Sequence, residues 1–265
     1  MRVAVVIFAL LAVGLVTVSA VAFSVSARPA LNQGSSRTVP LVQPLTTGSI
    51  GTSQIFAGYA VVAAKTVFAI AGDWNIPKVH GKCPSVKTEI AYVGISIGGY
   101  STNESGFAGT GTECYGGSVH DFVTYTIAPY YYLPSMKVSG GDHIQASLTY
   151  VSSTRTLSVT LYDSTTGIGV TNHGVVRLGK HSDALWSVQV GASASVAILP
   201  LVDFGNVTFT GCTATVNGTT SHDLGHYSNT AIEMYNKAGT GFKAAVGVIA
   251  SNNKSFGITW KSTGP

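Results

Sequence analysis

The chain has 265 residues, of which 45% are hydrophobic and only 10% are charged, whereas about 25% charged residues is usual for soluble proteins. Its 15 Lys and Arg residues stand against 11 Asp and Glu residues, and without a basic cluster this small excess gives no footprint for nucleic-acid binding. A chain with few ion pairs loses little when its carboxylates are protonated, so the composition favours tolerance of acid.

The N-terminal segment determines the compartment. Residues 3–25 carry no charge, and a run of this length can cross a bilayer core. Residues 1–27 are therefore a cleaved signal peptide or a retained membrane anchor, and cleavage sites of the small-x-small type end at Ala20 and Ala27. Either alternative predicts an extracellular or cell-surface protein, with the membrane as a partner if the segment is retained.

Residues 28–54 show no periodicity and contain many Pro, Gly and Ser residues, which predicts an extended, poorly ordered lead-in. Residues 55–265 predict a single all-β domain, because short runs rich in Val, Ile, Thr and aromatic residues alternate with turn residues. We expect strands within residues 57–64, 66–77, 89–97, 119–129, 143–151, 156–164, 184–192, 207–216, 231–236 and 255–261. The segment "GFAGTGTECYGG", residues 106–117, is interpreted as a loop.

Several of these runs alternate with a period of two. In residues 143–151, apolar Ile144, Ala146 and Leu148 face away from a polar set of Gln, Ser and Thr, and residues 156–164 repeat the pattern. One apolar and one hydroxyl-rich face per strand is what a sheet packed on a second sheet requires. The sequence therefore predicts a β-sandwich of about ten or more strands.

Cysteine, asparagine and histidine patterns add to the extracellular interpretation. Three cysteines in an exported chain leave at least one thiol unpaired, and no Cys/His cluster has metal-ligand spacing. His222 and His226 are close in sequence, but their glycine-containing segment favours exposed polar side chains over a metal site. We expect no metal and no cofactor. N-glycosylation sequons occur at Asn103, Asn206, Asn217 and Asn253.

Eight segments, in order, resemble the glutamic peptidases, or eqolisins, especially their bacterial and archaeal branch. They are "FAGYAV", "GDWNIPKV", "AYVGISI" with "GTGTEC", "GGDHIQASLTY", "LYDSTTG", "LPLVDFGNVTFTGCTATVNG" and "SFGITW", spanning residues 56–260. The resemblance implies a concanavalin-like jelly roll of two large antiparallel sheets with a substrate cleft. It also implies peptide hydrolysis in acid, with a Glu as general base and a Gln that stabilises the oxyanion.

Both catalytic positions of this family are substituted here. The family's Gln precedes Thr-Gly after the "AYVGISI" strand, and Gly109 stands there; the family's Glu corresponds to Leu185 in "ALWSVQV". Glu113 lies in the segment of the missing Gln, and Gln189 lies on the strand of the missing Glu. Together they could restore the two residue types with their positions exchanged. Against this, each is also an ordinary polar residue, and catalysis fails for displacements of about an ångström.

The resemblance assigns three further features. Cys83 and Cys114 stand where similar bacterial members carry cysteines, which implies a disulfide and leaves Cys212 unpaired and buried. Asp203 matches a position that is structural in the family. Aromatic residues of the cleft region would grip an extended peptide or a glycan, although packing within the fold is an equal alternative: Trp74, Tyr125, Tyr130, Tyr131, Tyr132 and Trp186.

Three hypotheses follow for the function. The first is an exported, catalytically degenerate protein with the glutamic peptidase fold that acts as a binding or structural surface protein. The second is an active acid endopeptidase with a relocated dyad. The third is a self-assembling subunit of an extracellular filament or surface layer, which rests on the apolar N-terminal segment, the lead-in and the sparse charge.

Overall fold

The computed structural model describes residues 51–264 apart from residues 102, 192–197 and 219. The expected signal peptide or anchor and most of the expected lead-in lie outside these residues. Within the described part of the chain, no helix is long and apolar enough to span a membrane. The expectation of an all-β fold is confirmed: the described residues form sixteen strands and a single 3-10 turn at Leu224–His226.

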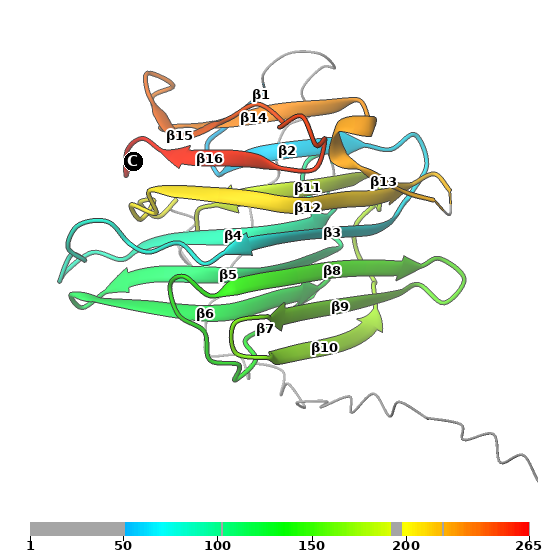
Figure 1. Ribbon diagram of the computed structural model, residues 1–265, viewed down its shortest axis with the longest axis horizontal. Coiled ribbons are helices and arrows are strands. Elements are labelled where there is room, and N and C mark those ends of the chain that lie inside the picture. Colours follow the sequence, from blue (N-terminus) through cyan, green and yellow to red (C-terminus); the bar gives the residue numbers. More distant parts are fainter. Residues whose placement is uncertain (1–50, 102, 192–197, 219, 265) are drawn as a thin grey trace, which may run out of the picture.

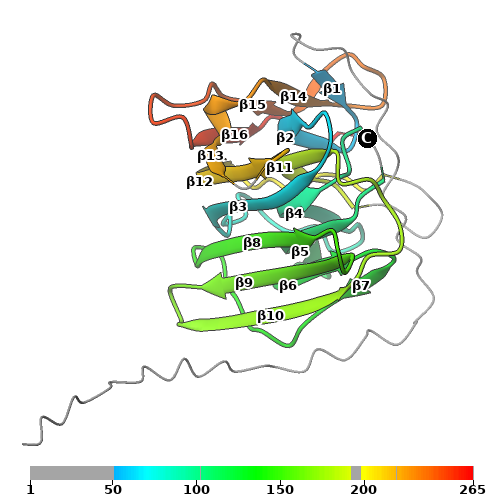
Figure 2. The same cartoon turned by 90° about the vertical axis from the view of Figure 1, so that its right-hand side faces the viewer.

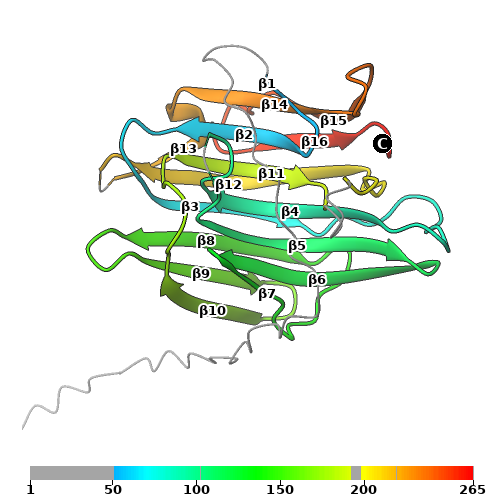
Figure 3. The ribbon, with the colours of Figure 1, turned by 180° about the vertical axis from the view of Figure 1, so that it is seen from behind.

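The strands form one hydrogen-bonded path that doubles over into two layers (Figure 1). The front sheet has the order β10-β9-β8-β3-β12-β16-β15, and the back sheet has the order β14-β2-β11-β4-β5-β6-β7. The pairing of β14 with β15 joins the two sheets. Figure 2 shows the layers from the side, and Figure 3 shows the back sheet facing the viewer.

The front-sheet strands are β10 (Ile168–Val175), β9 (Thr156–Asp163), β8 (His143–Val151), β3 (Val67–Asn75), β12 (Asn206–Val216), β16 (Phe256–Trp260) and β15 (Phe242–Val246). The back-sheet strands are β14 (Asn229–Tyr235), β2 (Phe56–Val62), β11 (Asp183–Gln189), β4 (Glu89–Ile97), β5 (Gly106–Tyr115), β6 (Ser118–Ile127) and β7 (Tyr130–Tyr132). Two short strands lie off this path: β1 (Gly51–Ser53) pairs in parallel with β14, and β13 (Ser221–Asp223) pairs with β12.

The period-two patterns give the faces that were expected. In β8 the side chains of Ile144, Ala146 and Leu148 are buried between the sheets, and in β9 Leu157, Val159 and Leu161 are buried likewise. Both strands turn hydroxyl-bearing residues to the outside of the front sheet. Alternation therefore fixed which face of each strand enters the core.

Two tryptophans connect the sheets. Trp186 of β11 donates its indole N–H to the carbonyl of Ala71 in β3 at 2.8 Å, and Trp74 of β3 donates to the hydroxyl of Thr110 in β5 at 3.0 Å. Both side chains are almost completely buried. Gly72 lets the Trp186 ring approach, since a β-carbon there would lie 2.9 Å from its Cδ1. Each sheet thus sends one indole into the other.

Residues 106–117 differ from the sequence expectation. They were expected to form a loop, but Gly106–Tyr115 is the ten-residue strand β5, paired on both sides with β4 and β6. Its three glycines, Gly106, Gly109 and Gly111, concealed it, because glycine weakens strand patterns. The end of the expected lead-in also forms strand β1, and β7, β10, β13 and β15 were not expected.

We predict that Trp186→Phe lowers the free energy of unfolding by about 2–4 kcal/mol, because it removes buried volume and the bond to Ala71. Chemical denaturation measures this loss. The control is Trp260→Phe, since Trp260 is only partly buried and its indole lies 3.5 Å from the Leu201 carbonyl oxygen. Equal losses in the two variants would contradict the linking role of Trp186.

Candidate functional site

The centre of the back sheet's outer face, the face turned away from the front sheet, is built from very small residues. Register places Gly58 of β2, Ser187 of β11, Gly94 of β4, Gly109 of β5 and Thr124 of β6 side by side across five strands. Residues directly opposite in neighbouring strands share a face. The row therefore presents almost no side-chain volume where the family resemblance places the catalytic Gln.

Two phenylalanine rings cover these glycines. A β-carbon at Gly109 would collide with the Phe107 ring, and one at Gly94 would lie 2.7 Å from the same ring. A β-carbon at Gly111 would collide with the Phe122 ring. The rings of this outer cluster pack with the remaining members, Ile90, Tyr92 and Leu199. The space above Gly109 is therefore filled by the protein's own aromatic side chains.

Leu185 lies in the neighbouring row. It stands opposite Ala60 of β2 and Ser96 of β4, and Ser96 stands opposite Phe107. Its side chain is 1% exposed. A buried leucine side chain can neither accept a proton nor orient a water molecule. Sequence and geometry thus agree that Gly109 and Leu185 contribute packing to this face.

Glu113 and Gln189 share the outer face but do not form a pair. Gln189 stands opposite Tyr92 in β4, which stands opposite Gly111, and Glu113 is one step further along β5. Strand β4 lies between them and separates their backbones by roughly 10 Å, which is the same separation that the register gives Leu185 and Gly109. The amide of Gln189 donates to the Ser187 hydroxyl at 3.0 Å, and Glu113 lies opposite His120 of β6.

A different carboxyl group, Glu104, borders the same face. It is half-buried and hydrogen-bonds to the hydroxyl of Thr126, which stands opposite Phe107 in the row of Leu185. Burial raises the pKa of Glu104 from 4.5 to about 7, and the nearby carboxylate of Asp183 adds to the rise. No pattern in the sequence distinguished this glutamate, since it lies in a short connection.

Asp183 holds the connection that carries Glu104. Its carboxylate accepts hydrogen bonds from the backbone N–H groups of Tyr100 at 3.0 Å and Ser101 at 3.1 Å, and from the Ser101 hydroxyl at 2.6 Å. Burial raises the pKa of Asp183 although these donors oppose the rise. The first residue of β11 thereby anchors the segment between β4 and β5.

The aromatic residues expected in a cleft divide into two groups. Trp74, Trp186 and Tyr125 are at most 1% exposed and lie between the sheets, so the expectation that they bind a ligand is corrected: they pack the core. Tyr131 lies opposite Thr126 and Tyr132 opposite Tyr125, on which it stacks with ring centroids 4.8 Å apart. The exposed residue of β7 is Tyr130.

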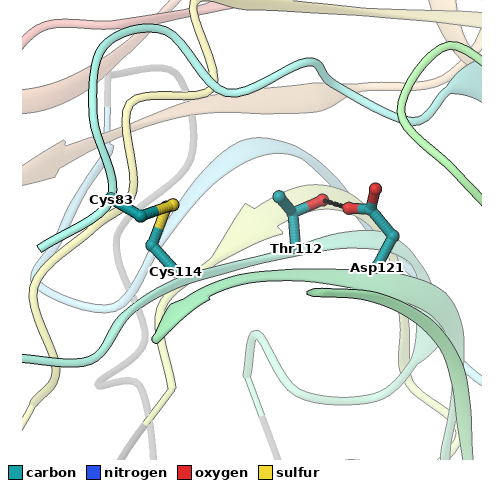
Figure 4. Close-up of a disulfide and its surroundings, with 4 residues drawn as sticks. All are labelled: Cys83, Thr112, Cys114 and Asp121. Atoms are coloured by element: carbon teal, nitrogen blue, oxygen red, sulfur yellow. Dashed lines mark hydrogen bonds between the residues drawn. A yellow bond between two sulfur atoms is a disulfide. The ribbon is translucent and has the colours of Figure 1, made fainter. Parts of the chain in front are cut away.

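The disulfide between Cys83 and Cys114 is confirmed, with Cα atoms 5.0 Å apart (Figure 4). It ties the connection before β4 to the end of β5. Beside it, the Thr112 hydroxyl donates to the Asp121 carboxylate at 2.8 Å. Cys212 is unpaired and buried, as expected. Asp203 accepts the N–H of Gly205 at 3.0 Å, which is consistent with a structural position.

The remaining expected site residues lie at the surface or at its edge. All four sequon asparagines, at 103, 206, 217 and 253, are exposed. His222 and His226 stack on each other with ring centroids 4.1 Å apart. Within the described residues, no three His, Cys, Asp or Glu side chains are grouped to hold a metal ion.

The sequence model of the Peptidase A4 family matches residues 54–260, which include both sheets and the outer face described above. The chain belongs to the Peptidase A4 family. No curated protein sequence shows significant similarity to it.

Solved structures of glutamic peptidases have the same fold. Scytalido-glutamic peptidase, solved with a transition state analog inhibitor, superposes with a TM-score of 0.64 at 18% identity, covering 79% of this chain and 99% of its own. The eqolisin SCP-B, solved with the tripeptide Ala-Ile-His, gives 0.62 at 19% with the same coverage. Aspergilloglutamic peptidase from Aspergillus niger gives 0.54 at 25%, covering 65% of this chain and 99% of its own.

We predict that Gly109→Gln destabilises the fold by about 1–3 kcal/mol, because the new side chain must displace the Phe107 ring. The added variant Phe107→Ala removes the ring contact but leaves the Val93 carbonyl oxygen, which lies 2.5 Å from a β-carbon at position 109. The double variant therefore keeps part of the loss but is less destabilised than the sum of the single variants. Urea denaturation of the four proteins measures the coupling. Gly218→Gln is the control at an open, exposed position; strict additivity at 107 and 109 would contradict the contact.

We predict that the protein is more stable at pH 4 than at pH 8. When folding raises the pKa of a carboxyl group, the folded state binds more protons than the unfolded state. The stabilisation from such a group is complete below about pH 4.5 and is lost as the pH rises through 7. For Glu104 the loss is on the order of 3 kcal/mol. Burial also raises the pKa of Asp73, Glu89, Asp121, Asp183 and Glu233.

Thermal unfolding from pH 4 to pH 8 tests this dependence. Glu104→Gln keeps a neutral side chain near Thr126 and should flatten the profile above pH 5. Glu113→Gln removes a carboxyl from the same face without involving Thr126 and serves as the control. A Glu104→Gln profile as steep as that of the unaltered protein would refute the assignment.

Proposed function

We propose that this protein is an exported, non-catalytic member of the Peptidase A4 family that serves as a binding or structural protein at the cell surface. One observation carries the proposal. The two positions that the family resemblance assigns to catalysis are occupied by Gly109, which lies beneath the Phe107 ring, and by Leu185, which is buried.

The family's chemistry requires two specific groups. A general base must remove a proton from the attacking water, and an amide donor must stabilise the oxyanion of the tetrahedral intermediate. Glycine and leucine supply neither group. The outer cluster around Phe107 also occupies the volume that a water molecule and a scissile carbonyl would need.

An extracellular location is supported by the Cys83–Cys114 disulfide, because such bonds persist in oxidising compartments. The exposure of the four sequon asparagines is compatible with glycosylation. We infer that the ligand, if the back sheet binds one, is a peptide or a glycan. Tyr130, which is exposed at the edge of this sheet, offers apolar area with a hydroxyl group for such a contact.

A second candidate function, an acid endopeptidase with a relocated acid, is favoured by Glu104. Its carboxyl borders the row of Leu185 and its raised pKa would leave it protonated in acid. A group with a strongly shifted pKa at the edge of a family's reactive face is a candidate acid or base. Its hydrogen-bond partner is the Thr126 hydroxyl, which cannot replace the family's amide.

Digestion of a denatured protein substrate between pH 2 and pH 5 distinguishes the two candidates. We expect no cleavage above background by the unaltered protein, while an active glutamic peptidase degrades the same substrate in parallel. The variants Glu104→Gln, Glu113→Gln and Gln189→Ala are assayed alongside. Cleavage that is abolished by one of these substitutions would overturn the non-catalytic proposal and identify the relocated residue.

A further inference from the structure

A groove of about 520 Å³ opens at one end of the sandwich, away from the outer cluster. Three connections line it: residues 63–65 after β2, the β8–β9 hairpin with Tyr150 and Arg155, and residues 176–182 between β10 and β11. The β8–β9 hairpin lies at the right-hand end of Figure 1. All lining residues belong to the described part of the chain, and the volume falls within the range of about 300–1,000 Å³ for small-molecule sites.

The lining carries positive charge almost exclusively. Lys65, Arg155, Arg177 and Lys180 border the groove together with His181, and no Asp or Glu is among the lining residues. Four of the chain's 15 Lys and Arg residues therefore meet in one place. Like charges gathered around a concave surface repel one another and attract anions.

Asp183 is the acidic residue that is closest in sequence to the lining segment 176–182. Asp183 follows the lining residue Ser182, but its carboxylate binds the N–H groups of Tyr100 and Ser101 and the Ser101 hydroxyl. Those donors lie in the connection that carries Glu104. The Ser182 hydroxyl lies 3.5 Å from the same carboxylate. All of these hydrogen-bond donors are neutral, and none of them is a Lys or Arg of the groove.

Arg155 occupies a backbone position that does not suit an arginine. Its φ is 54°, in the left-handed region that favours glycine or asparagine. The turn is tied to the third lining segment, because the Val176 N–H donates to the Arg155 carbonyl at 2.9 Å. Backbone geometry does not account for an arginine here, whereas a role for the guanidinium at the rim of the groove does.

An aromatic pair completes the wall. The rings of Tyr150 and His181 stack with centroids 3.6 Å apart and an interplanar angle of 14°. His181 Nε2 is buried and has no hydrogen-bond partner within the described residues, and burial lowers the pKa of this imidazole. The wall thus combines flat aromatic area with a buried polar atom that has no hydrogen-bond partner within the described residues.

We propose that this groove binds a polyvalent oxyanion, namely phosphate or sulfate groups, including those esterified to a small saccharide. Arginine side chains pair with such groups through two parallel hydrogen bonds, and lysines add point charge. A ligand with a single carboxylate would not balance the positive charge of the four Lys and Arg side chains. This site lies outside the face considered for peptidase chemistry, so it does not depend on the proposed function.

Calorimetric titration of the full chain tests the site with three probes: inorganic pyrophosphate, sucrose octasulfate and uncharged sucrose. We expect the anions to bind, sucrose not to bind, and the affinity to fall as salt is raised. Binding of pyrophosphate alone identifies a free small oxyanion as the ligand, and binding of the octasulfate alone identifies esters on a saccharide. Failure of both anions to bind, or binding of sucrose as tight as that of the octasulfate, overturns the proposal.

Matched variants locate the binding. Arg155→Asn and Arg177→Ala should each weaken anion binding roughly tenfold, whereas Lys237→Ala, at an exposed position in the β14–β15 turn, should leave it unchanged. Asparagine suits the backbone at position 155, so Arg155→Asn should keep the melting temperature or raise it. Unchanged affinity in both arginine variants would overturn the proposal even if anions bind elsewhere.

Discussion

The two indole hydrogen bonds between the sheets are the constraint on which the rest of the structure depends. Trp186 reaches from β11 to β3, and Trp74 reaches from β3 to β5. Because each bond satisfies a buried donor, it fixes the distance and the register between the layers as well as filling volume. Strands β11 and β5 are also the strands that carry Leu185 and Gly109. Their inner faces hold the sandwich together while their outer faces form the candidate site.

The outer face combines the sheet geometry of the family with a row of very small residues at its centre. The row of Gly58, Ser187, Gly94 and Gly109 has almost no side chains on the outer face. Without a covering group, this row would be a depression in the surface of the sheet. Phe107, from the adjacent row of the same strand, covers it with its ring. The ring compensates for the missing side chains, since it restores apolar contact over glycines that otherwise weaken a strand.

Because charged residues are few in this chain, the places where they cluster are informative. Burial raises the pKa of every carboxyl group whose pKa is shifted. The negative charge of Asp183 raises the pKa of Glu104 further. The cations gather around the groove between residues 63–65, Arg155 and residues 176–182, whose lining includes no Asp or Glu.

The sequence by itself determined the all-β class, the inward faces of β8 and β9, and, through the family resemblance, the Cys83–Cys114 pairing. These features depend on periodicity and residue identity, which are local. Only the tertiary structure decided that residues 106–117 form a central strand, that Trp74, Trp186 and Tyr125 lie in the core, and that Glu113 and Gln189 are separated by β4. It also brought Phe107 over Gly109 and gathered the cations of three distant connections, because such contacts arise from sheet register and the stacking of layers, which no single segment encodes.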